Sequence, residues 1–398
     1  MRSGALIGER RAVGLVFALN GTVTGTFASR LPWIAARLHL SSGLLGLVGL
    51  TMSVGALIAM PPAARFVHRF GPAATTRWLI AGSSAALVLP ALAPDLIALC
   101  AAMLVFGALI GVTDNAMNAQ AVEAERRAGR PIMSGLHGRW SVGVLAGALA
   151  GSLAAHLRIQ PPAQFAVVAL IAAAGGATAC LAFAGAPPDG AAAEAAGPRF
   201  AWPHGRLLLI GLVGFAAIFV EFAANDWAAV FLHWELHASQ AQAALGTGAF
   251  AAAMAGGRLG GDAAVRRAGP AASVRGCGVL GIAGCLLVAV APAAPVALAG
   301  FVLIGLGVSV VVPQVFSAAG RTSGSAAIGV AGVATVSYGA GMAAPSAMGG
   351  IADLTSLRVA FAVAALLAAA VAAGAGLLDP VPSAGPGAAA WQADEPGG

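Results

Sequence analysis

The chain has 398 residues, of which 59% are hydrophobic and 9% are charged, and its formal net charge at pH 7 is +6. Soluble domains carry about 25% charged residues, so this composition excludes a water-soluble globular protein. The basic residues lie in short segments between apolar runs and form no folded basic face, which argues against a nucleic-acid-binding protein.

Long apolar runs recur along the chain and predict an all-α membrane protein, because each run is near the ~20 residues that cross a bilayer as a helix. The runs are continuous, unlike the alternating segments of a transmembrane β-barrel. We expect twelve transmembrane helices, at residues 12–29, 44–63, 76–94, 96–118, 134–155, 164–184, 206–231, 241–260, 274–292, 296–318, 325–349 and 357–378.

The composition changes between the sixth and seventh spans, where Gly, Pro and Ala dominate a segment typical of a linker. The predicted organisation is a six-helix bundle at 1–185, a cytoplasmic linker at 186–203, a second six-helix bundle at 204–378 and a disordered cytoplasmic tail at 379–398.

The arginines indicate how the chain is oriented. There is no lysine, so all 21 basic residues are arginines. With the N-terminus inside, seventeen lie in cytoplasmic segments and four lie outside, namely Arg30, Arg37, Arg158 and Arg358. Because cytoplasmic loops carry an excess of basic residues, we expect a multi-pass protein of the bacterial inner (plasma) membrane with both termini in the cytoplasm.

The two sets of six spans are related by an internal repeat. Three pairs of segments share a displacement of 198 residues: 69–77 with 267–275, which match at six of nine positions, His39–Ser41 with His237–Ser239, and Gly107 with Gly305. One displacement over so long a stretch predicts two pseudo-symmetric bundles.

Several motifs carry a resemblance to a known family: Gly107-x-x-x-Gly111-x-x-Asp114-x-x-Met117-Asn118-x-Gln120-Ala121, Gly129-Arg-Pro-Ile-Met-Ser134, His137-Gly-x-Trp140-Ser141, Arg30-Leu-Pro32, Leu40-Ser41 and Glu221-x-x-x-x-Asp226-Trp227. Over residues 12–378 the chain resembles the MosC-like or YbjJ-like branch of the major facilitator superfamily. The segment 64–71 is similar to the loop signature of that superfamily, with Ala64, His68 and Pro72 in place of its glycine, aspartate and arginine. The resemblance implies the major facilitator fold and a proton-linked or facilitative transporter of a small solute.

Few polar side chains lie inside the spans, and such groups usually face a water-filled cavity because they are costly in lipid. The candidates for substrate binding are Asn20, Thr24, Asn118, Asn225, Gln314 and Tyr338. The candidates for proton coupling are Glu221, Asp114 and Asp226. Most of these residues are in spans 1, 4, 7 and 10, which the resemblance implies line a central cavity.

Two of the acids have alternative roles. Glu221 is the first choice as proton carrier, since an acid in a low-dielectric cavity can exchange its proton, but it can also serve as a structural hydrogen-bonding partner. Asp114 is predicted near the cytoplasmic mouth, where a lock with Arg130 or Arg139 is an equal alternative to coupling or solute binding. The candidates for gating are Arg30, Arg69, His137, Arg139, Arg258, Asp262 and Arg267.

No metal or cofactor is predicted, because the four cysteines lack metal-ligand spacing and His233, Glu235 and His237 offer too few ligands. Neither HExxH nor GxxxxGK[ST] occurs, so we expect neither an enzyme nor an ATP-driven pump. The leading hypothesis is a secondary transporter, acting as a monomer in the lipid bilayer, which moves a small polar solute by alternating access with protons as coupling ion. A drug or metabolite efflux antiporter and a non-transporting membrane sensor are the alternatives.

Overall fold

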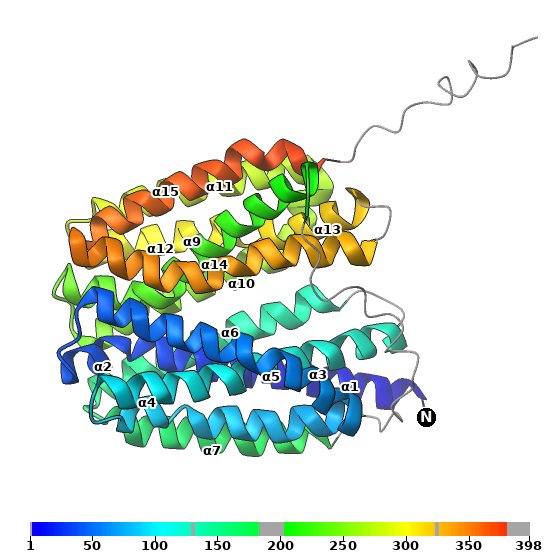
Figure 1. The fold of residues 1–398 in the computed structure, drawn as a ribbon, viewed down its shortest axis with the longest axis horizontal. Helices are drawn as coiled ribbons and strands as arrows, with labels where there is room; N and C mark the ends of the chain where they lie inside the picture. The colour runs from blue at the N-terminus through cyan, green and yellow to red at the C-terminus, as the bar shows by residue number, and fades with distance from the viewer. Residues whose placement is uncertain (1, 129–131, 182, 184–202, 323–325, 380–398) are drawn as a thin grey trace, which may run out of the picture.

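The spans fold into two helical bundles in the computed structural model, which describes residues 2–128, 132–181, 183, 203–322 and 326–379. The first bundle, blue to teal in Figure 1, contains α1 Arg2–Ser29, α2 Leu31–Arg37, α3 Ser42–Ala86, α4 Leu89–Leu92, α5 Leu96–Ala128, α6 Met133–His156 and α7 Pro161–Cys180. The second, green to red, contains α9 Arg206–Trp234, α10 Gln240–Ala268, α11 Pro270–Ala289, α12 Ala294–Val308, α13 Val311–Thr322, α14 Ala326–Leu354, α15 Leu357–Gly374 and the short 3₁₀ helix η1 Ala375–Leu378. The predicted all-α fold is confirmed.

The connections between the helices gather at two ends of the molecule. We call the end that holds α2, α4 and the connections 157–160 and 235–239 the far end, and the end that holds the start of α1 the terminal end (Figure 1). Arg206 donates to the Leu377 carbonyl at 2.9 Å, so the second bundle begins and finishes at the terminal end. The predicted linker and tail lie outside the described residues except for Pro203 and Asp379.

Eight segments of the described chain are long and apolar enough to cross a membrane, among them Leu96–Ala121 and Arg206–Trp234. Helices α6 and α10 are less apolar, and they pack against each other where the two bundles meet. A helix that packs against another helix favours small and polar side chains over large apolar ones. This explains why the hydropathy of α6 and α10 indicates a membrane span less strongly than that of the other helices.

The connection between the second and third spans differs from the predicted loop. Residues 42–86 form one continuous helical segment, α3. The glycine Gly107 of α5 abuts Met52, whereas Thr113, six residues further along α5, donates to the Leu79 carbonyl at 3.1 Å. A straight helix would separate Met52 and Leu79 by about 40 Å. Therefore α3 turns back on itself and supplies two antiparallel arms without leaving helical backbone.

Two other spans also depart from their predicted limits. Helix α5 continues past the predicted residue 118 to Ala128, and the Glu125 carboxylate accepts from the Ile132 backbone N–H at 2.7 Å at the start of α6. The tenth span is divided into α12 and α13. Pro313 lacks the N–H that would bond to the Ser309 carbonyl, which explains the break at this point.

The internal repeat extends to backbone detail. His39 and His237 both adopt φ of 52°, a left-handed conformation that side chains rarely take. Each stands two residues before a serine that caps the next helix, α3 or α10. Likewise, Gly107 abuts the Met52 carbonyl and Gly305 abuts the Phe250 carbonyl, and both pairs are related by the 198-residue displacement.

Gly107→Ala should therefore destabilise the protein, because the added Cβ would collide with the Met52 carbonyl. Overpacking of this kind costs about 1–3 kcal/mol. Gly256→Ala is the matched control, since a Cβ at that position of α10 meets nothing within 4 Å. Thermal unfolding of the purified protein in detergent checks the prediction, and equal melting temperatures for the two variants would contradict the tight crossing of α3 and α5.

A candidate coupling site between the bundles

One ion pair lies where the two bundles meet. The Glu221 carboxylate of α9 accepts from the Arg258 guanidinium of α10 at 3.2 Å, and a second Arg258 nitrogen donates to Ser141 Oγ of α6 at 3.1 Å. Arg258 therefore connects an acid of the second bundle to a hydroxyl of the first. The side chains of Arg258 and Glu221 are 14% and 18% exposed, so removing either charge leaves the other poorly solvated.

The residues around Ser141 extend this polar cluster into the first bundle. His137, one turn before Ser141, lies within electrostatic range of Arg258 and packs edge-on against Phe17 of α1, with ring centroids 5.4 Å apart. Trp140 donates its indole N–H to Asn20 Oδ1 at 3.0 Å. The indole thus connects α6 to α1 inside the first bundle.

The second predicted pair of side chains, Asp114 and Asn118, lies on α5. Asn118 Nδ2 donates to the backbone carbonyl of Asp114 at 2.9 Å, and the Asn118 side chain also interacts with the Asp114 carboxylate. The predicted lock with Arg139 is not formed in this structure, because Arg139 donates to the Gly135 carbonyl at 3.3 Å and packs against Gly14. Arg130 lies outside the described residues.

Other candidates for solute binding or coupling are spread along α1, α9 and α13. Asn225 Nδ2 donates to Asp226 Oδ1 at 2.8 Å, one turn from Glu221. Thr24 donates to the Asn20 carbonyl at 3.1 Å, and Gln314 is half-buried on α13. The side chains of Tyr338 and Asp262 lie outside the described residues.

The remaining gating candidates make other contacts than the ion pair or are exposed. Arg30 is buried and donates to the Ile159 carbonyl at 2.7 Å, a contact within the first bundle. Arg69 and Arg267 are exposed, and the Arg69 guanidinium lies over the Phe70 ring. At the far end Glu235 pairs with Arg358 at 3.3 Å and His233 Nδ1 lies 2.8 Å from the Ala238 carbonyl, so both side chains already have protein partners.

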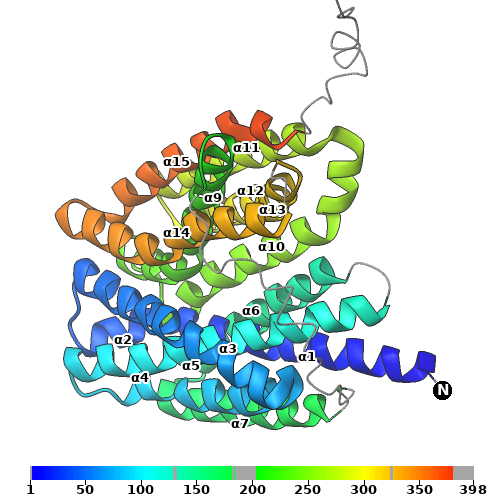
Figure 2. The ribbon, with the colours of Figure 1, turned by 45° about the vertical axis from the view of Figure 1, so that its right-hand side comes forward.

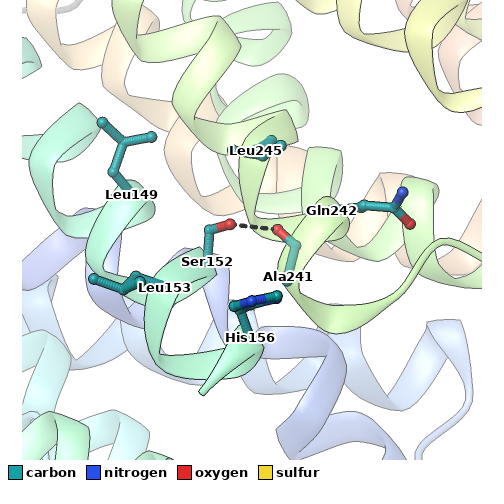
Figure 3. A pocket seen from close by; sticks show the side chains of 7 residues that line it. All are labelled: Leu149, Ser152, Leu153, His156, Ala241, Gln242 and Leu245. Atoms are coloured by element: carbon teal, nitrogen blue, oxygen red, sulfur yellow. Dashed lines mark hydrogen bonds between the residues drawn. The ribbon is translucent and has the colours of Figure 1, made fainter. Parts of the chain in front are cut away.

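The bundles are packed together toward the far end. Ser152 of α6 donates to the Ala241 carbonyl of α10 at 2.7 Å, beside a shallow groove of about 300 Å³ that opens between Leu149 and Leu245 (Figure 3). On the other side of the interface, Ser53 of α3 donates to the Gly341 carbonyl of α14 at 2.9 Å. In both cases a hydroxyl of the first bundle binds a backbone carbonyl of the second.

The contacts between α3 and α14 continue to the last turn of α14. A Cβ built at Gly43 lies 3.4 Å from the Asp353 Cβ, and one built at Gly49 lies 2.6 Å from the Pro345 Cβ. Figure 2 shows α3 and α14 adjacent, with α10 bending away from the first bundle toward its other end. Sequence reasoning did not single out Ser53 or Ser152, because small hydroxyl residues are common in transmembrane helices and carry no signal of their partner.

Comparison with known proteins places this geometry in context. A family model described as Major Facilitator Superfamily matches residues 13–344. An uncharacterized MFS-type transporter of Yersinia pestis is 36% identical over 380 residues, which cover 93% of this chain and 95% of that protein. An uncharacterized transporter of Sinorhizobium fredii is 34% identical over 91% of this chain and 96% of that protein. The membrane protein MosC of Rhizobium meliloti is 27% identical over 87% and 84%.

Solved structures share the fold at low identity. The nucleoside transporter NupG has a TM-score of 0.68 at 14% identity and covers 94% of this chain and 98% of that one. A bacterial homolog of the human lysosomal transporter Spinster has a TM-score of 0.69 at 16% identity, with 95% and 96% covered. The E. coli fucose:proton symporter FucP has a TM-score of 0.61 at 15% identity, with 94% and 98% covered.

Proposed function

Because the chain belongs to the major facilitator superfamily, we propose that it is a secondary active transporter that carries a small polar solute by alternating access and is coupled to protons at Glu221. The contact that supports the coupling most is the bridge from Glu221 through Arg258 to Ser141. Of the solved structures with this fold, FucP is a fucose:proton symporter, which supports a proposal of proton coupling.

The charges of the bridge suggest how a proton would act. While Glu221 is ionised, it neutralises Arg258 and holds the guanidinium near Ser141 of the other bundle. A proton on the Glu221 carboxylate removes the negative charge, and Arg258 then gains by leaving a partner that no longer compensates it. The contact between bundles therefore depends on the protonation of Glu221, which couples proton binding to movement of one bundle against the other.

The contacts between the bundles at the far end must break in the other half of the transport cycle. In this structure the contacts of Ser152 and Ser53 join the bundles at the far end and toward the middle of the interface. We assign the terminal end to the cytoplasm on the arginine distribution, which makes this an inward-facing arrangement. Solute release to the other side requires these hydroxyl-to-carbonyl contacts to separate, at a modest cost for each neutral hydrogen bond.

Solute-driven proton movement tests the proposal. The purified protein is reconstituted in liposomes that contain a pH-sensitive dye, and small polar solutes such as polyols, sugars, amines and amino acids are added outside. We expect at least one solute to change the internal pH, with no response in protein-free liposomes. If labelled solute crosses the membrane with no accompanying proton movement, the transporter is facilitative and the coupling role of Glu221 is wrong.

A further inference from the structure

A groove of about 300 Å³ lies between α6 and α10, beside the hydrogen bond from the Ser152 hydroxyl to the Ala241 carbonyl. Its walls come from different bundles, and they include Leu149, Leu153 and His156 of α6 and Gln242 and Leu245 of α10 (Figure 3). Because both bundles are needed to form the groove, a ligand bound in it contacts both bundles at once.

The α6 wall of the groove belongs to an apolar stripe that faces the membrane. The stripe consists of Val142, Ala146, Leu149 and Leu153, which follow at steps of three or four residues and therefore lie on one side of α6. All four residues are exposed. Apolar side chains are left exposed on a transmembrane helix where it meets lipid, whereas polar ones turn toward the interior. From Val142 to Leu153 the stripe rises roughly 16 Å, close to the depth of one leaflet of a hydrocarbon core about 30 Å thick.

The groove becomes polar and positive where it reaches the far end. His156 and Gln242 are exposed there, and Arg158, which is also exposed, follows two residues after His156. Glu235, the acid in the connection that leads into α10, pairs with Arg358 at 3.3 Å and is already neutralised within the second bundle. Arg158 therefore leaves a positive charge at this end of the groove, at the level where lipid headgroups lie.

We propose that the groove binds an anionic phospholipid, with one acyl chain against the leucines and the phosphate at the end that carries His156 and Arg158. The chain lies along walls that are already apolar. The phosphate accepts hydrogen bonds from the Arg158 guanidinium and from the N–H groups of His156 and Gln242. A zwitterionic lipid offers the same phosphate, but Arg158 repels its ammonium group, so the groove selects the anionic headgroup.

Such a lipid favours the arrangement seen here. Its site requires α6 and α10 to be in contact, and the two walls separate when the Ser152 hydroxyl leaves the Ala241 carbonyl during the transport cycle. A ligand that binds one of two conformations shifts the equilibrium toward that conformation. The bound lipid therefore opposes opening of the far end. This consequence rests on the alternating access proposed above, whereas the lipid site itself does not.

Photoreactive lipids test the site. The full chain is reconstituted in phosphatidylcholine vesicles that contain a small fraction of phosphatidylglycerol or phosphatidylethanolamine, each with the same photoreactive acyl chain, and labelled peptides are identified by mass spectrometry. We expect phosphatidylglycerol to label residues 149–153 and 241–245 at least about fivefold more strongly than phosphatidylethanolamine, which is the effect of one basic residue near the membrane surface. Leu170 and Ile171 of α7 are exposed apolar residues outside the groove, and both lipids should label them equally. Equal labelling of the groove by both lipids, or the same preference on α7, would overturn the proposal.

Variants locate the headgroup and the chain separately, with labelling read on residues 241–245. Arg158→Gln should remove the preference for phosphatidylglycerol, whereas Arg275→Gln, which changes an exposed arginine of α11, should retain it. Leu149→Trp fills the groove and should abolish labelling by both lipids, whereas Leu170→Trp should leave it unchanged.

Labelling requires no transported solute, so its failure leaves the proposed transport function intact, and a failure of transport leaves the lipid site intact. Melting temperatures show that each variant is folded, and native mass spectrometry gives the number of chains and lipids in each particle. A full preference for phosphatidylglycerol in Arg158→Gln would overturn the assignment. A dimer of this chain that excludes lipid from the groove would overturn it as well.

Discussion

Transport should stop when a disulfide joins the two bundles at the far end, and it should resume when that disulfide is reduced. A Cβ at Gly43 of α3 lies 3.4 Å from the Asp353 Cβ of α14, close to the Cβ separation of about 3.5–4.5 Å that disulfides adopt. The double variant Gly43→Cys, Asp353→Cys therefore forms the bond without large backbone movement. Because the bond holds the bundles in the arrangement seen here, the far side stays closed and we expect solute flux to fall to the level of protein-free liposomes.

The control places an equally short disulfide inside one bundle. A Cβ at Gly374 of α15 lies 3.8 Å from the Val213 Cβ of α9, and both helices belong to the second bundle. If the bundles move as units, Val213→Cys with Gly374→Cys should form its disulfide and still transport. The four native cysteines, Cys100, Cys180, Cys277 and Cys285, are free and are replaced by alanine in both experiments.

The same disulfide tests the orientation of the chain. If the far end faces outward, a reductant that cannot cross the membrane should restore transport in intact cells. Restoration only after permeabilisation would reverse the predicted topology. If oxidised Gly43→Cys, Asp353→Cys protein transports at the wild-type rate, then the far end does not open during transport and the rocking mechanism is wrong.

The spans were predictable from the sequence because each depends on local composition, whereas their junctions depend on packing. The run of apolar residues at Leu96 identifies α5, but nothing local shows that the helix continues to Ala128 and that Glu125 binds the start of α6. The turn inside α3 was predicted as a loop because it lies between two predicted spans and residues 64–71 resemble the loop signature of the superfamily. The structure retains helical backbone there, and both arms of α3 are stabilised by packing on α5.

The candidate site was predictable residue by residue but not as an arrangement. Glu221 and Arg258 were each expected to have a functional role. Their pairing was not predicted, because two residues 37 apart lie on different helices and helical periodicity does not indicate a contact between them. Ser141 was noted only as part of a motif, although it supplies the contact with the other bundle.

Glu221→Gln should abolish accumulation of the solute against a gradient while exchange of solute across the membrane persists. With one proton per solute, a pH difference of one unit supports about tenfold accumulation in the wild type. The amide keeps the size of the side chain and its ability to accept from Arg258, which lies 3.2 Å away, but it can no longer take up the coupled proton. We therefore expect the accumulation ratio of the variant to fall to unity in liposomes with an imposed pH gradient.

The matched control is a second ion pair among the described residues of the second bundle. Glu235 binds Arg358 at 3.3 Å and is 20% exposed, close to the 18% of Glu221, but it lies at the far end and has no contact with α6. Glu235→Gln therefore removes a carboxylate from a comparable pair without touching the bridge between bundles, and its accumulation ratio should match that of the wild type. Melting temperatures show whether each variant is still folded. A structural defect lowers exchange and accumulation together, whereas an uncoupled variant loses accumulation alone. If Glu221→Gln still concentrates its solute in response to the pH gradient, Glu221 serves only to neutralise Arg258, and the proton must be carried by another acid of the interface, of which Asp114 and Asp226 are the remaining candidates.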